Sequence, residues 1–219
     1  MNLEHWEKQQ VSELEDAKSQ FPSGGKVLDL GAGDGSTSKL FGSGWEWVGI
    51  DISPLNSSVI KGDAHKLDFP DEKFDIVISV AVFEHLHSPW IAIKEVSRVL
   101  KTGGYFLGTV AFLEPEHANS YFHTSRRGMS RLLEEGGLTK LLIEPTRKNW
   151  NVMTSMKLLP IPGIKSYNLI KSKVVFGLRA TLIQFRIWTL KGDKKDRGLA
   201  FQETEKYRYS GAFRFKAQK

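Results

Sequence analysis

The sequence contains no cysteine among its 219 residues. This absence excludes disulfide bonds, thiolate nucleophiles and cysteine-ligated zinc, and it is typical of proteins from a reducing compartment. No apolar run approaches the roughly 20 residues that a membrane-spanning helix needs. The amino-terminal segment MNLEHWEKQQ also lacks the apolar core of a signal peptide. From the sequence we therefore expect a cytoplasmic location.

The composition excludes the disordered and fibrous classes, because hydrophobic residues make up 40% of the chain and charged residues 26%. The length fits one domain that has been enlarged by an insertion. We expect a single domain over residues 1–219.

Acidic residues are missing from one long stretch, which runs from Glu144 to Asp193. Residues 146–219 carry 17 Lys and Arg against 4 Asp and Glu, whereas residues 1–145 carry 14 against 21. A basic and aromatic stretch predicts an anionic partner such as a phospholipid head group, a nucleic acid or a phosphorylated substrate. Alternatively, it is a partly buried subdomain whose lysines solvate its outer surface. Its aromatic residues are Trp150, Tyr167, Phe176, Phe185 and Trp188.

Apolar runs rich in β-branched and aromatic residues alternate with helical or loop segments. Helical periodicity predicts helices over residues 2–21, over SPWIAIKEVSRVLK, which Gly103-Gly104 should stop, and over residues 125–135. This alternation predicts a mostly parallel α/β sheet that is covered on both faces. The predicted strands are KVLDLG, WEWVGIDIS, SSVIKGD, FDIVISVAV, GGYFLGTV, LTKLLIEPT and RYSGAFRFKAQ.

The segment VLDLGAGDG places Gly31, Gly33 and Gly35 directly after the first predicted strand. A backbone without side chains lets N–H groups approach a ligand closely, and parallel sheets bind ligands at the carboxyl ends of their strands. A dinucleotide-binding loop would have the spacing GxGxxG, whereas the spacing here is GxGxG. By itself this pattern is a weak signal for a ligand, and a tight turn with no ligand is the alternative.

Acidic residues end the next two predicted strands. Asp51 ends WEWVGIDIS about twenty residues after the glycines, where a nucleotide site needs a carboxylate for the ribose hydroxyls. Asp63 follows the third strand in Gly62-Asp63-Ala64. Each acid alone is also a common turn residue. Glycines and two acids at successive strand ends favour a nucleoside ligand.

In this order, VLDLGAGDG, GIDIS, GDAHKLDF, FDIVISVAVFEHL and EVSRVLKTGGYFLGTV resemble the successive motifs of class I S-adenosylmethionine-dependent methyltransferases. The likeness covers residues 20–145 and is strongest to the type 11 group, which includes quinone, sugar and small-metabolite methyltransferases. It implies a Rossmann-like, mostly parallel seven-stranded sheet with helices on both faces and an antiparallel last strand. The implied organisation is an N-terminal helix (1–21), a cofactor-binding core (22–146), a basic aromatic insertion (147–205) that forms a lid or docking surface, and the last strand (206–219).

The resemblance also implies the cofactor, S-adenosylmethionine, and the residues that hold it. Asp29 would lie at the head of the glycine loop. Asp51 would hold the ribose, and Ile52 would lie against the adenine. The remaining implied contacts are Gly31 and Gly33, with Ala32 between them, for the methionine part, Asp63 and Ala64 for the adenine edge, and Ser79 and Val80 for the methionine side near the sulfonium.

The connection between the second and third strands departs from the family pattern. Only the segment from Ser53 to Ser58 separates them, which is too short for a crossover helix. We therefore expect this side of the sheet to be open.

A sulfonium is already an activated methyl donor, so the protein mainly aligns the reactants and excludes water. A general base is needed only for a hydroxyl or protonated amine acceptor, and histidine suits that role near neutral pH. The candidate bases are His85 and His123, and the residues expected to contact the acceptor are Glu84, His117 and Tyr121. Glu84 and His85 have the alternative role of orienting their loop or capping a helix at Ser88. The histidine spacing is not diagnostic of a metal site, and no metal is expected.

These features predict methyl transfer to a small-molecule, sugar or lipid-linked acceptor, with docking to an anionic membrane surface if the basic insertion is a docking surface. One alternative is an RNA or protein methyltransferase that holds a macromolecule with its basic last third. Another is a regulatory subunit that binds the cofactor without transferring its methyl group.

Overall fold

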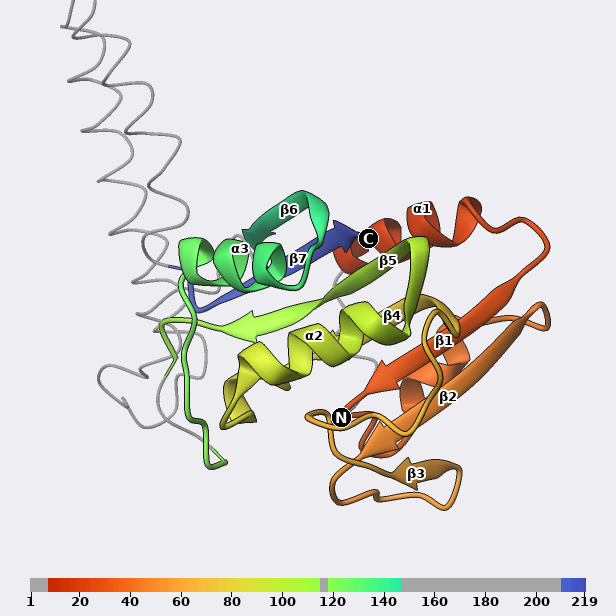
Figure 1. Ribbon diagram of the computed structural model, residues 1–219, viewed down its shortest axis with the longest axis horizontal. Helices are drawn as coiled ribbons and strands as arrows, with labels where there is room; N and C mark the ends of the chain where they lie inside the picture. Colours follow the sequence, from red (N-terminus) through yellow and green to blue (C-terminus); the bar gives the residue numbers. More distant parts are fainter. Residues whose placement is uncertain (1–7, 115–117, 147–209) are drawn as a thin grey trace, which may run out of the picture. The chain divides into compact units, whose positions relative to one another are not determined.

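A computed structural model describes residues 8–114, 118–146 and 210–219, and it places seven strands in one sheet (Figure 1). The strand order is β3-β2-β1-β4-β5-β7-β6, so β1 and β4 lie at its centre. This arrangement confirms the predicted seven-stranded α/β sheet. The strands are β1 (Gly25–Leu30), β2 (Trp45–Asp51), β3 (Val59–Lys61), β4 (Phe74–Val80), β5 (Leu100–Ala111), β6 (Thr139–Pro145) and β7 (Ala212–Gln218).

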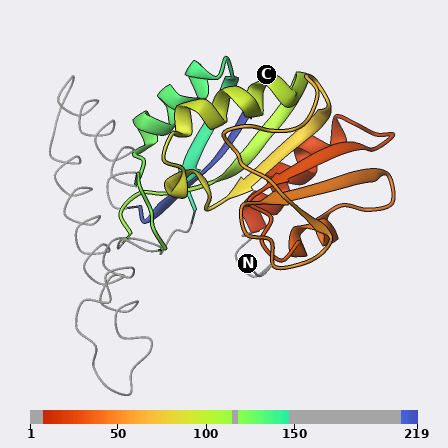
Figure 2. The same ribbon diagram turned by 60° about the horizontal axis from the view of Figure 1, so that its bottom comes forward.

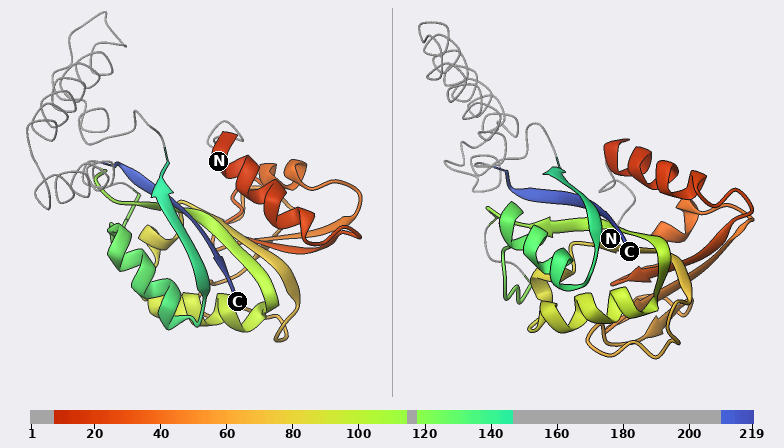
Figure 3. Two further views of the ribbon diagram at one scale, coloured as in Figure 1. Left: turned by 90° about the horizontal axis from the view of Figure 1, so that it is seen from above. Right: turned by 45° about the horizontal axis from the view of Figure 1, so that its top comes forward.

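Helices cover both faces of the sheet, as predicted. Helix α1 (Lys8–Ser19) lies on one face, and α2 (Pro89–Val99) and α3 (Arg126–Glu135) lie side by side on the other (Figures 2 and 3). Ser125 caps α3, because its hydroxyl accepts a hydrogen bond from the Gly128 amide at 3.1 Å. Two 3₁₀ turns, η2 (Ser36–Leu40) and η3 (Phe83–His85), follow β1 and β4.

The centre of the sheet is buried. All seven residues of β4 are buried, as expected for a parallel strand that is covered on both faces. On the α1 face, Leu14 and Ala17 pack against Val27 of β1 and Ile78 of β4. Each large aliphatic side chain buried in this way stabilises the fold by about 1.5–3 kcal/mol. The buried core therefore holds the carboxyl ends of β1 and β4 in fixed positions.

Strands β1 to β5 pair in parallel in the order β3-β2-β1-β4-β5. The last strand runs the other way, because its carboxyl end lies beside the start of β5: the Gly103 amide donates to the Lys219 carbonyl, and the Lys219 amide donates to the Gly104 carbonyl. The antiparallel last strand implied by the family resemblance is thus confirmed, with bounds of Ala212–Gln218.

One local prediction was wrong. The helix after β4 ends at Val99, and β5 begins at Leu100, so the Gly103-Gly104 pair does not stop the helix. Leu100 is fully buried and pairs with Phe74, and the register between β4 and β5 shifts before Ile76. The two glycines therefore lie inside β5, in the stretch where its pairing with β4 is irregular. The glycine loop leads into the short 3₁₀ turn η2.

The connection between β2 and β3 contains no helix, although the two strands are parallel. Apolar side chains on and beside this connection remain exposed: Ile52 is 64% exposed, Leu55 76% and Ile60 54%. The prediction of an open side of the sheet is confirmed.

The chain divides into two compact units, Met1–Ala111 with Glu116–Glu144 and Phe213–Lys219, and Phe112–Pro115 with Pro145–Ala212. All of the candidate site residues belong to the first unit. The predicted insertion over residues 147–205 lies outside the described residues. Among the helices that the structure describes, none has the length and apolar character to span a membrane.

Candidate cofactor and active site

Strand register brings the predicted cofactor residues to one edge of the sheet. Leu30, the last residue of β1, pairs with Ile50 of β2 on one side and with Ser79 of β4 on the other. Asp51 pairs with Lys61 at the end of β3. Since parallel strands end at the same edge, the glycine loop, Asp51, Asp63 and Ser79 all lie at the carboxyl ends of four adjacent strands.

The glycine loop has a left-handed backbone at every glycine, with φ of 75° at Gly31, 54° at Gly33 and 72° at Gly35. Residues other than glycine are strained in this region. The amides of Gly31 and Ala32 both donate to the Ile50 carbonyl, at 2.8 and 2.9 Å. The loop is therefore anchored to the end of β2, and its conformation explains why three glycines occur in five positions.

A second reason for glycine at position 31 is packing within the protein. A Cβ atom built on Gly31 would lie 2.3 Å from Cγ2 of Val82, which belongs to the segment between β4 and η3. That distance is far shorter than any real contact between carbon atoms. Gly31 thus allows the β1 and β4 ends to approach each other closely.

Asp51 connects the glycine loop to the turn that follows β2. Its Oδ2 accepts a hydrogen bond from the Gly33 amide at 2.9 Å, and its Oδ1 accepts one from the Ser53 amide at 2.8 Å. The Leu55 amide in turn donates to the Gly33 carbonyl at 3.0 Å. The carboxylate is therefore held in one orientation, as a group that binds a ribose must be. Ile52 follows it with an exposed apolar side chain.

Asp29 is only 2% exposed and accepts a hydrogen bond from the Thr37 hydroxyl of η2. Burial penalises the charged carboxylate, and it raises the pKa of Asp29 to about 7 despite the opposing hydrogen bond from Thr37. Asp29 thus joins β1 to the turn after the glycine loop, and its charge depends on pH near neutrality.

Among the described residues, His65 is the one that donates hydrogen bonds to the Asp63 carboxylate. The His65 amide donates a hydrogen bond to Oδ1 of Asp63 at 2.9 Å, and the ring nitrogen Nδ1 of His65 lies 2.7 Å from the same oxygen. These hydrogen bonds, first of all the one from the amide, hold the pKa of Asp63 below its ordinary value. Ala64 between them is buried. Asp63 therefore presents an ionised carboxylate.

Ser79 and Val80 end β4, and both are buried. The Ser79 hydroxyl has no hydrogen-bond partner among the described residues. Leaving a buried hydroxyl unsatisfied costs about 1–3 kcal/mol, and a ligand bound at this strand end would supply the missing partner.

The predicted acceptor residues follow β4 and β5. Glu84 of η3 is 1% exposed, and its carbonyl accepts hydrogen bonds from the amides of Tyr121 at 2.7 Å and Phe122 at 3.2 Å. Tyr121 is thereby placed beside η3, with its side chain 61% exposed. His85, on η3, is half-buried. His123 is also half-buried, and its Nε2 lies 3.1 Å from the hydroxyl oxygen of Ser120. The predicted residue His117 lies outside the described residues.

A sequence model of a known family, described as a methyltransferase domain, matches residues 28–108 of the chain. This range begins in β1 and ends in β5, and it contains the glycine loop, Asp51, Asp63 and Ser79. Together with the fold and the site geometry, this match identifies residues 28–108 as a class I S-adenosylmethionine-dependent methyltransferase domain.

Several proteins of this class resemble the chain. It is 35% identical over 99 residues to 2-methyl-6-phytyl-1,4-hydroquinone methyltransferase of Synechocystis, covering 38% of this chain and 31% of that protein. It is 39% identical over 107 residues to the tRNA (carboxymethyluridine(34)-5-O)-methyltransferase of Arabidopsis thaliana, covering 44% and 26%. The matched segments thus span well under two thirds of these relatives.

A third similar protein is the uncharacterized methyltransferase YcgJ of Bacillus subtilis, which is 28% identical over 162 residues, or 66% of this chain and 60% of that protein. Its crystal structure superposes with a TM-score of 0.56 at 17% identity, covering 97% of this chain and 99% of that one. The superposition confirms the Rossmann-like methyltransferase fold.

Class I methyltransferases use S-adenosylmethionine, and the residues present in this one fit that cofactor. The strand ends offer an oriented carboxylate at Asp51, an ionised carboxylate at Asp63 and a buried hydroxyl at Ser79 whose hydrogen bond is not made within the described protein. Among the described residues, no group of three or more histidine, cysteine or carboxylate side chains is placed to hold a metal ion.

Three residues that support this methyltransferase site were not identified from the sequence: Thr37 bonds Asp29, His65 bonds Asp63, and Val82 packs on Gly31. The position of His65 two residues after Asp63 is a spacing typical of an Asx turn, so its amide contact could have been anticipated. Thr37 and Val82 lack any comparable local signal, because their contacts depend on the packing of separate elements.

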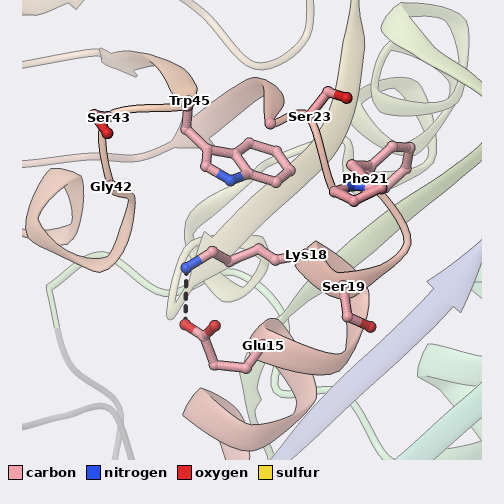
Figure 4. Close-up of a pocket in the computed structure, with 11 residues that line it drawn as sticks. Glu15, Lys18, Ser19, Phe21, Ser23, Gly42, Ser43 and Trp45 are labelled. Atoms are coloured by element: carbon pink, nitrogen blue, oxygen red, sulfur yellow. Dashed lines mark hydrogen bonds and ion pairs between the residues drawn. The ribbon is translucent and has the colours of Figure 1, made fainter.

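A pocket of about 510 Å³ lies at the opposite edge of the methyltransferase sheet, where α1 ends and β1 and β2 begin (Figure 4). The rings of Phe21 and Trp45 line it. Lys18 also lines the pocket, and its ammonium group donates hydrogen bonds to the Glu15 carboxylate and to the Leu40 carbonyl, each at 2.8 Å. The pocket therefore lies far along the strands from the glycine loop and is distinct from the cofactor site.

Proposed function

We propose that the chain transfers the methyl group of S-adenosylmethionine to a small-molecule, sugar or lipid-linked acceptor. The observation that most supports cofactor binding is the Asp51 carboxylate, which two backbone amides hold at the edge of the glycine loop. In this proposal Asp51 binds the ribose, Ile52 and Ala64 flank the adenine, and Asp63 contacts its edge. Gly31, Ala32, Gly33, Ser79 and Val80 surround the methionine part, and Asp29 supports the loop.

The bound cofactor would supply a methyl group that is already activated on a sulfonium. The protein then has to place the acceptor atom in line with that methyl group and to keep water away. The buried end of β4 and the η3 turn provide such an environment. For a hydroxyl or protonated amine acceptor, His85 or His123 would remove the proton.

An apolar part in the acceptor is supported by the surface that follows β4. Trp90 at the start of α2 is 45% exposed and Phe122 is 41% exposed, and their ring centroids are 5.9 Å apart. Tyr121 extends this surface. The similar Synechocystis protein is named for a substrate that carries a phytyl chain. An acceptor with an aromatic or aliphatic portion would bury these side chains.

A second candidate function is methylation of RNA or protein. The charge of residues 146–219 favours an anionic macromolecule, and one similar protein is named a tRNA methyltransferase. Binding through many basic side chains would be steeply weakened by salt, because it releases counterions. A small-molecule acceptor would show little salt dependence.

The deciding experiment incubates the protein with S-adenosylmethionine labelled in its methyl group and with fractionated cell extract. Label in the lipid, saccharide or metabolite fraction supports the proposal, whereas label in RNA or protein supports the second candidate. Cofactor binding without label in any fraction would favour a regulatory subunit and contradict both.

We also propose a cytoplasmic location, because the chain contains no cysteine, and peripheral binding to anionic membranes, because residues 146–219 carry a net positive charge. Sedimentation with anionic and with neutral phospholipid vesicles at low salt tests this. Equal sedimentation with the two kinds of vesicle, or none, would contradict it.

A further inference from the structure

Two histidine rings stack beside the acid that is proposed to contact the adenine. The ring centroids of His65 and His87 are 4.1 Å apart, and the planes are inclined by only 15°. Nδ1 of His65 lies 2.7 Å from Oδ1 of Asp63, and the amide of Ser88 donates to Nε2 of His65 at 3.3 Å. His65 thus connects the loop after β3 to the start of α2.

These two contacts determine which nitrogen of His65 carries the proton. Since the Ser88 amide is a donor, Nε2 must be the acceptor and carries no proton. Nδ1 then carries the proton and donates a hydrogen bond to the Asp63 carboxylate. Asp63 therefore accepts two hydrogen bonds from one residue, through its amide and its ring.

The contacts continue to the acceptor side. His87 meets the ring of Tyr121 edge-on at a centroid distance of 6.3 Å, with the planes at 77°. Tyr121 is fixed in turn by its amide, which donates to the Glu84 carbonyl at 2.7 Å. A continuous series of side-chain contacts therefore joins Asp63 to Tyr121.

The loop after β3 is also attached to α2 without His65. Glu95 accepts a hydrogen bond from the Leu67 amide at 2.8 Å. Arg98 donates to the Leu67 carbonyl at 2.9 Å and to the Phe69 carbonyl at 2.7 Å. Because these contacts hold the loop in place, substitutions of His65 should leave the fold intact.

We propose that His65 is a positioning residue that orients the Asp63 carboxylate for the cofactor and, through His87, couples cofactor binding to the order of the segment that contains Tyr121. This inference rests on the proposed role of Asp63 at the adenine. It assigns no contact between His65 and the acceptor.

The first test separates the two hydrogen bonds of His65. Affinity for S-adenosylhomocysteine is measured by calorimetry for the wild type and for His65→Ala, His65→Asn and His65→Gln. The Asn amide can occupy the place of the Nδ1 donor, whereas the Gln oxygen can occupy that of the Nε2 acceptor. We expect a loss of about 5- to 10-fold for Ala and Gln, the size of one net hydrogen bond, and less than about twofold for Asn.

Equal losses in all three variants would show that only packing is involved, and affinities equal to the wild type would show that Asp63 needs no support; either result overturns the proposal. A wild type that does not bind S-adenosylhomocysteine would instead refute the proposed function, and this inference with it.

The second test measures the coupling by hydrogen exchange of the Ser88, Tyr121 and Phe122 amides. Saturating S-adenosylhomocysteine should slow exchange several-fold in the wild type and in His87→Phe, which keeps a stacked ring. This protection should be absent in His65→Ala and His87→Ala. Protection by S-adenosylhomocysteine that persists in His65→Ala would overturn the coupling.

Discussion

The Asp51 carboxylate accepts a hydrogen bond from the Gly33 amide at 2.9 Å, so the acid that ends β2 holds the loop that follows β1. Its other oxygen holds the Ser53 amide. The same side chain therefore shapes the glycine loop and offers the carboxylate that the proposed ribose contact requires.

Replacing Asp51 by Ala should abolish cofactor binding. The change removes the acceptor of two backbone amides and the charge at the ribose, and we expect affinity for S-adenosylmethionine to fall at least about 100-fold, since two hydrogen bonds to a charged group are lost. Calorimetry measures this loss. Asp51→Asn keeps one acceptor oxygen and should bind with intermediate affinity. Unchanged affinity of Asp51→Ala would disprove the location of the site.

Gly31→Ala should destabilise the protein by more than backbone strain alone. A left-handed alanine costs about 1–2 kcal/mol, and overpacking against Val82 adds about 1–3 kcal/mol. Gly103→Ala is the matched control, because Gly103 has φ of 82° and no atom within 4 Å of an added Cβ. Urea unfolding should show a larger loss for Gly31→Ala, partly restored by adding Val82→Ala. Equal losses for the two glycines would contradict the packing argument.

Ser79→Ala should separate stability from binding. Removing a buried hydroxyl that has no partner among the described residues should leave the melting temperature unchanged or raise it. If that hydroxyl bonds the cofactor, affinity for S-adenosylhomocysteine should fall by about 3- to 10-fold, the value of one hydrogen bond. Ser130→Ala on α3, which loses only a bond to Glu134, serves as the control. A stability loss without a change in affinity would assign Ser79 a structural role.

Asp29 should make the folded protein less stable as the pH rises. Its pKa of about 7 in the folded protein lies above the value of 3.8 expected for the unfolded chain. Between these values the folded state binds a proton that the unfolded chain has lost, so stability falls with increasing pH. From pH 5 to pH 8 the free energy of unfolding of the wild type should fall by about 3 kcal/mol relative to Asp29→Asn.

Urea titrations of both proteins at several pH values measure this difference. Thr37→Val provides a directional control, because losing the hydrogen bond that favours the charged carboxylate should raise the pKa of Asp29 further. A constant difference between the wild type and Asp29→Asn across this pH range would show that Asp29 does not titrate there.

Most of the fold could be predicted from local patterns. The apolar, β-rich runs indicated the strands, and their alternation with helical segments indicated a mostly parallel sheet. The start of β5 could not be predicted, because the helical periodicity of α2 continues into Leu100. There, pairing with Phe74 competes with the helix, and this contact between distant parts of the chain determines the outcome.

The sequence by itself determined that the glycine loop, Asp51 and Asp63 lie at one edge of the sheet, because the carboxyl ends of successive parallel strands lie at the same edge. Only the tertiary structure decided how those residues support one another. The contacts of Gly31 with Val82 and of His65 with His87 join elements that are distant along the chain. Distances between such elements depend on the packing of the whole core, which no local pattern of residues records.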